Sequence, residues 1–233
     1  MTTLRANVFC MVFIGAATAV AVYLYPMLPE QIPTHWNFNG EVDDYTSKPW
    51  GVAILPMAAL LVFAIMRLIP IISPKGFRTD KFMDVVNVFT VTIVGFMSGI
   101  AILVLLEANG QDVRINEMTF AGVGLMFIVL GNYMGKVRKN FFIGIRTPWT
   151  LASDEVWSRT HRLGGKVFVL TGIFMIVNSF VRFPGQTLVV AIVVAALIPV
   201  IYSYVIYRRI EGFPTDADDD PVDESAPTER RID

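Results

Sequence analysis

Six long apolar runs alternate with polar segments along the chain. They cover residues 8–25, 50–66, 85–106, 118–134, 167–181 and 187–207. A helix needs about 20 apolar residues to cross the ~30 Å hydrocarbon core of a bilayer. The runs are continuous and show none of the apolar and polar alternation of barrel strands, so the backbone groups must be satisfied within each segment. The pattern therefore predicts six transmembrane helices.

Composition and the placement of basic residues extend this prediction. The chain is 54% hydrophobic and only 17% charged, which excludes a soluble domain of 233 residues. Lys and Arg gather before the first run and in the second and fourth connections, and positively charged loops usually stay in the cytoplasm. We expect an all-α, polytopic protein of the cell membrane with both termini in the cytoplasm.

The first connection, residues 26–50, contains four prolines and the turn dipeptide formed by Asn39 and Gly40. These residues prevent a long helix and favour tight turns. We expect a structured extracellular loop, with a short hairpin as one form of it. Its polar side chains are candidate ligand-binding residues: His35, Asn37, Asn39, Asp43 and Lys48.

Metal binding is a weaker interpretation of this loop. Asn37, Asn39, Glu41 and Asp43 alternate like the first ligands of a calcium loop, but the glycine at the sixth position and the acid at the twelfth are missing. A closed zinc site needs more His or Cys residues than this sequence has. His35 is the one histidine of the loop, and the other histidine is predicted on the opposite side of the membrane. We expect no metal ligand set and no cofactor.

The segment 131–166 is basic and rich in Gly and Trp, and it lies mostly between two apolar runs. Gly131 and Gly135 form a GxxxG pair, which permits a neighbouring helix to approach closely. Pro148 blocks a helix through the preceding residue, and Thr150 or Ser153 can cap a helix that starts after it. The expected fold is a cytoplasmic loop that leads into a helix lying in the membrane interface.

That interfacial helix is expected from Ser153 to about Arg162. Trp157 and His161 lie four residues apart on one face, and Arg159 lies three residues before Arg162 on another. Such a helix rests on lipid headgroups with its aromatic side inward. Trp149 also suits this boundary.

Two explanations compete for the basic residues of this segment. Most fit the positive-inside rule and attraction to anionic lipids. Arg146 differs because it lies in an apolar turn, where its guanidinium could bind a carboxylate, backbone carbonyls or phosphate. The candidate partner-binding residues are Arg138, Asn140, Arg146, Trp149, Trp157, Arg159, His161 and Arg162.

The chain divides into three predicted parts. Residues 1–82 form a two-span unit with the extracellular loop, and residues 83–210 form a four-span unit with the cytoplasmic segment. Residues 211–233 contain nine acidic residues and two Arg, which predicts a disordered acidic tail. Cys10 is the only cysteine, so no disulfide forms within the chain.

Both connections also resemble a known family. The sequence IPTHWNFNGEVDDYTSK resembles the small domain of unknown function that often precedes SdpI-family proteins, and GNYMGK, NFFIGIRTPWTL, VW and THRLGG resemble the signature of the SdpI family itself. This resemblance implies immunity against a secreted peptide toxin that collapses the membrane potential. It also implies that the toxin-bound protein draws a soluble ArsR-type repressor to the membrane, with no direct contact of its own to nucleic acid.

Two other classes of function are less consistent with the sequence. An enzyme is not expected, because the distinctive polar residues are divided between opposite membrane faces. A coupled transporter usually places ionisable groups at mid-membrane, and the six runs contain none between their ends. Polar residues such as Asn87, Thr90, Thr92 and Asn178 indicate hydrogen bonds between helices instead. We therefore expect an SdpI-like immunity and signalling protein, with a membrane transporter or channel for a small solute or ion as the alternative.

Overall fold

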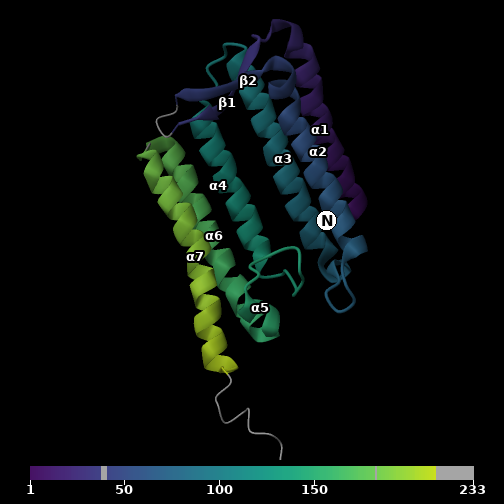
Figure 1. The fold of residues 1–233 in the computed structure, drawn as a ribbon, viewed down its shortest axis with the longest axis vertical. Helices are drawn as coiled ribbons and strands as arrows, with labels where there is room; N and C mark the ends of the chain where they lie inside the picture. Colours follow the sequence, from purple (N-terminus) through teal and green to yellow (C-terminus); the bar gives the residue numbers. More distant parts are fainter. Residues whose placement is uncertain (38–40, 182, 214–233) are drawn as a thin grey trace, which may run out of the picture.

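The computed structural model describes residues 1–37, 41–181 and 183–213. Seven α-helices and one antiparallel hairpin form the described part of the chain (Figure 1). In chain order the elements are α1 (Thr3–Leu24), β1 (Gln31–Trp36), β2 (Val42–Ser47), α2 (Lys48–Ile72), α3 (Met83–Ala108), α4 (Ile115–Met134), α5 (Pro148–Ala152), α6 (Asp154–Val181) and α7 (Gly185–Ile210).

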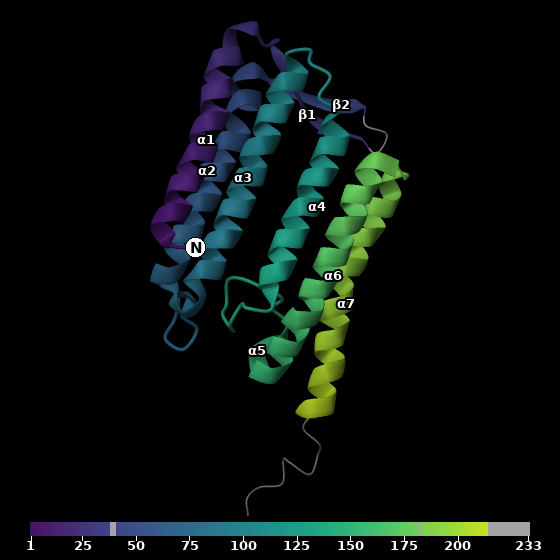
Figure 2. The same ribbon diagram turned by 180° about the vertical axis from the view of Figure 1, so that it is seen from behind.

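Six of the described helices, all except α5, are long and apolar enough to cross a membrane. They lie side by side as a bundle, with α1, α2 and α3 on one side and α4, α6 and α7 on the other (Figures 1 and 2). The β1–β2 hairpin lies at one end, here called the hairpin end. The α5 helix and the loop before it lie at the other, the loop end, toward which the N-terminus and the last turn of α7 also point. Which end faces the cytoplasm stays a prediction.

The six predicted spans are present, but most helices are longer than the apolar runs. The largest difference is at α6, which is continuous from Asp154 to Val181. The separate interfacial helix expected from Ser153 to Arg162 is therefore wrong, because those residues form the first turns of a membrane-crossing helix. The helix continues through Gly164 and Gly165 because both glycines lie against neighbouring elements and do not act as turns.

The apolar run 50–66 ends just before Arg67, but helix α2 continues past it to Ile72. The Arg67 guanidinium donates a hydrogen bond of 2.7 Å to the Asn87 side chain on α3. The Asn87 amide donates in turn to the Met1 carbonyl and the Thr3 hydroxyl, both at 3.2 Å. This network joins α1, α2 and α3, but it satisfies only one guanidinium nitrogen, because Nε and Nη2 of Arg67 are buried without a hydrogen-bond partner.

Only part of the expected hydrogen bonding between helices is present. Asn87 confirms the expectation, whereas the hydroxyls of Thr90 and Thr92 donate to carbonyls one turn earlier in α3 itself. Asn178 accepts from the Phe183 amide just beyond the end of its own helix. For these three residues the expectation was wrong, because a hydroxyl or amide can be satisfied locally by the backbone.

A seam of glycines holds α4 and α6 together. A Cβ atom added to Gly131 would lie 2.6 Å from the Gly165 carbonyl oxygen, and one added to Gly124 would lie 2.6 Å from the Gly172 carbonyl oxygen. The two pairs are seven residues apart on both helices, which therefore run antiparallel with their backbones in direct contact. The expectation that the glycine pair packs against a neighbouring helix is confirmed: Gly131 lies against Gly165, and Gly135 lies opposite Arg162 of the same helix, α6.

The hairpin predicted as one form of the first connection is also present, although the fold is then not strictly all-α. Its strands pair from Gln31 with Ser47 to Trp36 with Val42. The Ile32 side chain is fully buried and lies against Gly51 at the start of α2, where an added Cβ would be 2.5 Å from the Ile32 Cβ. The hairpin is thus docked on the bundle by apolar side chains of β1: Ile32 at its centre, the buried Pro33, and Trp36, which packs against the same cluster. The expected turn at Asn39 and Gly40 lies outside the described residues.

The first residues of the expected tail continue the fold. Gly212 has a positive φ of 74°, and the Phe213 ring packs against Tyr204 and Tyr207 of α7. These contacts place residues 211–213 with the bundle. The rest of the predicted tail, residues 214–233, lies outside the described residues.

Candidate functional site

The loop between α4 and α5, residues 135–147, is organised by the fully buried side chain of Asn140. Its amide nitrogen donates to the carbonyls of Arg138 and Ile143, at 2.8 and 2.9 Å. Its carbonyl oxygen accepts from the backbone amides of Phe142 and Ile143, at 2.8 and 2.7 Å. One asparagine thereby replaces the hydrogen bonds that a helix or strand would supply to this loop.

Trp157 and His161 form a stacked pair beneath the loop, with their ring centroids 4.1 Å apart. The Trp157 indole N–H donates to the Val137 carbonyl at 2.7 Å. His161 Nδ1 lies 2.8 Å from the Trp157 carbonyl, which can only accept, so this nitrogen carries the proton. The Nε2 atom then accepts from the Ile145 amide at 3.0 Å, and the imidazole is neutral.

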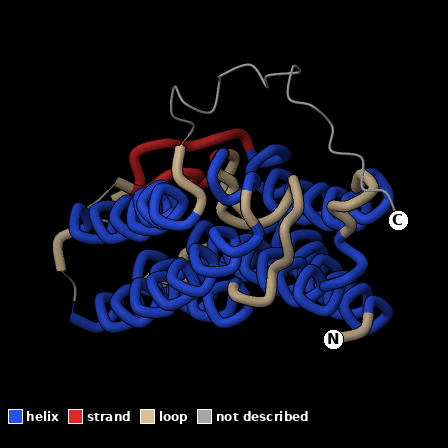
Figure 3. Tube along the Cα trace, turned by 90° about the horizontal axis from the view of Figure 1, so that it is seen from below, coloured by secondary structure: helices blue, strands red, loops and turns tan. Residues whose placement is uncertain are grey.

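Gly144 lets the loop pass close to this imidazole. Its φ is 113°, a conformation that L side chains rarely adopt, and a Cβ atom there would collide with His161. The buried histidine therefore fixes both the backbone path and the residue type at position 144. Seen from the loop end, the connecting segments cross over the ends of the helices (Figure 3).

The short helix α5 is held at its start by a capping box. Thr147 Oγ1 accepts from the Thr150 amide at 3.2 Å, and Thr150 Oγ1 accepts from the Thr147 amide at 2.9 Å. The Thr147 hydroxyl also lies 3.0 Å from the Ser203 hydroxyl of α7. Trp149 packs edge-on against Tyr204, with 5.1 Å between ring centroids. The segment is thus tied to α7 as well as to α6.

The eight candidate residues of this segment differ in how far their side chains are exposed. Asn140, Trp157 and His161 are buried and satisfied internally, so they support the loop and do not present their side chains to a partner. Trp149 is half-buried. The four arginines are exposed, at positions Arg138, Arg146, Arg159 and Arg162.

Two of the exposed arginines have partners within the chain. Arg146 donates to the Phe141 carbonyl. A carboxylate, backbone carbonyls and phosphate were the partners considered for it, and a backbone carbonyl is the one observed. Arg159 pairs with Glu155 one turn earlier, at 2.5 Å. These contacts orient the guanidinium groups but leave them open to solvent.

The hairpin end has a looser arrangement. His35 Nδ1 and Asp43 Oδ1 lie within hydrogen-bond distance, 2.5 Å, and the two side chains are 67% and 42% exposed. The Asn37 side-chain amide donates to Glu41 across the hairpin. His35 and Asp43 are exposed, whereas Asn37 is half-buried and bonded within the hairpin, and Asn39 lies outside the described part of the chain.

Lys48 differs from the other hairpin-end candidates because it is buried. Its ammonium donates to the Leu28 carbonyl at 2.8 Å and lies 4.9 Å from the centre of the Tyr25 ring. The Glu30 carboxylate is 3.8 Å away. Lys48 therefore fastens the start of α2 to the segment just after α1.

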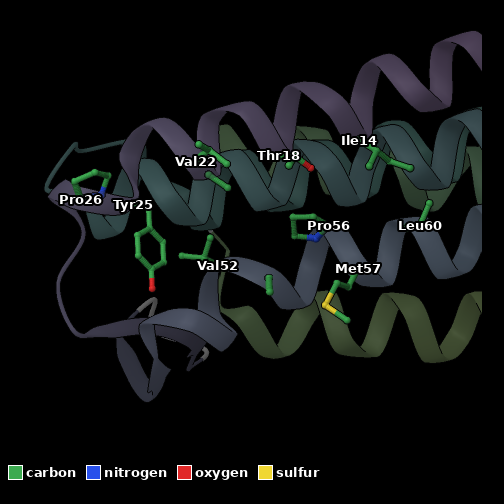
Figure 4. A pocket seen from close by; sticks show the side chains of 11 residues that line it. Ile14, Thr18, Val22, Tyr25, Pro26, Val52, Pro56, Met57 and Leu60 are labelled. Carbon is green, nitrogen blue, oxygen red and sulfur yellow. The ribbon is translucent and has the colours of Figure 1, made fainter.

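An apolar groove of about 550 Å³ lies between α1 and α2 and opens beside the hairpin (Figure 4). Tyr25 and Pro26 lie at the end nearest the hairpin, and Met57 and Leu60 lie further along α2. Its lining is almost entirely apolar. Among the described residues, no three His, Cys, Asp or Glu side chains come together as a metal site.

The fold and these two ends define the class: a polytopic helical membrane protein with a docked hairpin at one end and an internally hydrogen-bonded loop at the other. Residues 136–203 match the SdpI/YfhL protein family, and residues 12–60 match the Domain of unknown function (DUF1648). The chain is thus similar to the SdpI/YfhL family in its second half and to this domain of unknown function near its start.

The chain is 29% identical over 213 residues to the protein named Immunity protein SdpI of Bacillus subtilis (strain 168). The aligned region covers 90% of this chain and 99% of that protein. The name of this relative describes it as an immunity protein. No solved structure matches the chain.

Sequence reasoning missed several residues that build the loop end. Gly144 and Thr147 stand within the family-like sequence NFFIGIRTPWTL, and a glycine followed three residues later by Thr-Pro does indicate a turn and a helix start. The contact of His161 with Ile145 gave no such signal, because it depends on how α6 folds back on the loop.

Proposed function

We propose that this protein protects the membrane of its cell against a secreted antimicrobial peptide. The observation that carries this proposal is the similarity to an immunity protein over 90% of the chain, which includes both ends of the bundle. The hairpin end faces outward and the loop end faces the cytoplasm in this proposal. The concentration of Lys and Arg at the loop end supports that orientation.

The peptide is met at the hairpin end, in the groove between α1 and α2. A peptide that disrupts membranes must expose apolar side chains, and this groove offers an apolar lining at the level of the spans. His35, Asp43 and Asn37 lie on the nearby hairpin and supply polar groups for the remainder of the peptide. Binding here would keep the peptide from assembling in the surrounding lipid.

Signalling would use the opposite end. The exposed arginines of the loop end present positive charge from two segments whose backbones are already fixed: Arg138 and Arg146 lie on the loop after α4, and Arg159 and Arg162 lie in the first turns of α6. A preorganised surface of this kind loses little entropy on binding a partner. In this proposal the partner is a soluble ArsR-type repressor, which is recruited when peptide is bound.

Immunity is tested by expressing the full chain in a bacterium that is sensitive to the peptide and measuring survival and membrane potential. The parent chain should preserve both. Met57→Trp, which fills the groove, should reduce protection, and Met11→Trp, on an exposed face of α1 outside the groove, should not. If both variants protected the cell as well as the parent chain does, the groove would be removed from the proposal. If the parent chain were inserted in the membrane and gave no protection, immunity itself would be rejected.

Signalling needs a separate measurement, the amount of repressor that sediments with membranes when peptide is present. Arg146→Ala and Arg159→Ala should each lower recruitment, and Arg5→Ala, near the N-terminus and outside this loop, serves as the control. Unchanged recruitment in both loop variants would exclude this surface. If the purified chain in liposomes instead moved an ion or solute, the transporter alternative would replace the proposal.

A further inference from the structure

A basic groove of about 600 Å³ lies at the loop end, between the connection from α2 to α3 and the loop after α4. The cationic side chains that line it come from both segments: Arg78, Lys81, Lys136, Arg138 and Lys139. Its one acidic lining residue, Asp154, is already paired with Lys139 at 2.6 Å. The groove therefore carries a large excess of positive charge.

Most of this charge has no carboxylate partner. Arg78 pairs with the exposed Asp80 at 3.2 Å. Within the described ranges, Lys81, Lys136 and Arg138 form no ion pair, although the Lys136 ammonium lies 4.8 Å from the centre of the Tyr133 ring. Several unpaired cations that converge from two segments favour an anionic ligand over bulk solvent.

A second hollow of about 600 Å³ meets the groove at Gly135, which lines both. It follows the glycine seam of α4 and α6, past Gly131 and Gly165 toward Val169 and Leu170, and most of its lining surface is apolar. Its polar lining residues are Asn132, Arg162 and Lys166. The basic groove therefore continues into a trough along the spans, and two further cations line that trough.

We propose that this combined site binds one anionic phospholipid, with its phosphate in the basic groove and an acyl chain along the seam of α4 and α6. This ligand goes beyond the proposed immunity, because it belongs to the cell's own membrane. An acidic protein would use the basic groove but not the trough, which lies among membrane-spanning residues. A soluble phosphate would likewise leave the trough unused.

The site is tested on the purified full chain by native mass spectrometry, after incubation with dioleoyl phosphatidylglycerol or dioleoyl phosphatidylcholine. The chain should retain one phosphatidylglycerol at least about fivefold more strongly than phosphatidylcholine. Lys136→Gln should lower this retention about fivefold, the effect of about one basic residue near an anionic headgroup. Lys75→Gln removes an exposed charge from the same end that does not line the groove, and it should have no effect.

The variant Gly135→Leu tests the junction with the trough. A Cβ at this position lies at an ordinary distance of 3.5 Å from Arg162 Cγ, so the substitution is compatible with the fold but narrows the passage. It should lower phosphatidylglycerol retention while the thermal unfolding temperature stays within about 2 °C of the parent. If Gly135→Leu left the retention of phosphatidylglycerol unchanged, the placement of the acyl chain would be overturned.

Two further outcomes identify other ligands. If glycerol 3-phosphate displaced phosphatidylglycerol at equal concentration, the site would be a phosphate site with no lipid specificity, and the proposal would fail. Equal retention of the two lipids would also overturn it, and binding of an oligo-aspartate peptide in that case would indicate an acidic protein partner. Neither measurement uses the peptide toxin, so both are independent of the proposed immunity.

Discussion

The two ends of the bundle use their distinctive residues in opposite ways. At the hairpin end the polar candidates His35 and Asp43 are exposed, and the hairpin is held by the buried apolar side chain of Ile32. At the loop end Asn140 and His161 are fully buried and hold the loop by hydrogen bonds to its backbone. Distinctive residues therefore mark an available surface at one end and an internal framework at the other.

This contrast arises from the hydrogen bonding available to each segment. The hairpin satisfies its backbone by pairing two strands, so its polar side chains are not needed for support. The loop 135–147 has no regular hydrogen bonding of its own, and buried side chains must replace it. A buried polar residue at the loop end, such as Asn140 or His161, is thus expected to affect stability before it affects binding.

The largest effect is expected between α4 and α6, where no side chain separates the two backbones. Gly131→Val would place atoms against the Gly165 carbonyl and prevent the helices from meeting, so little folded protein should be recovered. Size-exclusion chromatography and thermal unfolding in detergent measure this. Gly99→Val is the control, because an added Cβ at Gly99 meets nothing within 4 Å. Equal recovery of both variants would contradict the seam.

Ile32→Ala is expected to be the most damaging change in the hairpin. The side chain is fully buried against the bundle, and such truncations cost about 3 kcal/mol. We expect faster proteolysis within residues 31–47 and a lower unfolding temperature. Thr34→Ala, at an exposed position of the same strand, should leave both unchanged. A larger effect of Thr34→Ala than of Ile32→Ala would reverse our description of how the hairpin is held.

Asn140→Ala tests the framework of the loop end. It removes four hydrogen bonds and leaves backbone groups unsatisfied, and we expect a loss of about 2 kcal/mol in the free energy of unfolding. Cleavage by trypsin at Lys139 should become faster. The matched change Asn132→Ala, at an exposed position of α4, should alter neither measurement. Unchanged protection of Lys139 in the Asn140 variant would show that the loop is held by something else.

The smallest effects are expected from the exposed side-chain pairs at both ends. Arg159→Ala and His35→Ala each break a solvent-accessible pair, and we expect each to lower the free energy of unfolding by less than about 0.5 kcal/mol. Chemical unfolding in detergent is sufficient to compare them. A loss above about 1 kcal/mol in either variant would show that the exposed residues also support the fold.

The spans could be located from the sequence because apolar runs mark them directly, and the hairpin could be foreseen from its prolines and turn residues. The start of α6 could not be located, because Arg159, His161 and Arg162 interrupt the apolar pattern although they belong to the helix. Arg67 was likewise not placed in the second span, because its charge ends the apolar run 50–66, yet it lies inside α2 and donates to Asn87 on another helix. Hydropathy reports on lipid exposure, and it misses helical residues that face protein or the membrane boundary.

The candidate site was predicted less completely than the spans. Exposed arginines of the loop end were identified from sequence, but burial of Asn140, Trp157 and Lys48 depends on contacts between segments that are distant in the chain. Gly144 has its role only because an imidazole lies beside it. Such pairings become visible when α6 is placed against the loop.

The indole of Trp157 has a consequence for spectroscopy. The four tryptophans of the chain divide evenly, with Trp36 and Trp50 at the hairpin end and Trp149 and Trp157 at the loop end. Trp157 is 3% exposed and donates to the Val137 carbonyl, whereas Trp50 is 64% exposed. Replacing the two tryptophans of one end by phenylalanine would leave tryptophan fluorescence that reports only on the other end. Changes at the two ends of the bundle could then be followed separately without a chemical label.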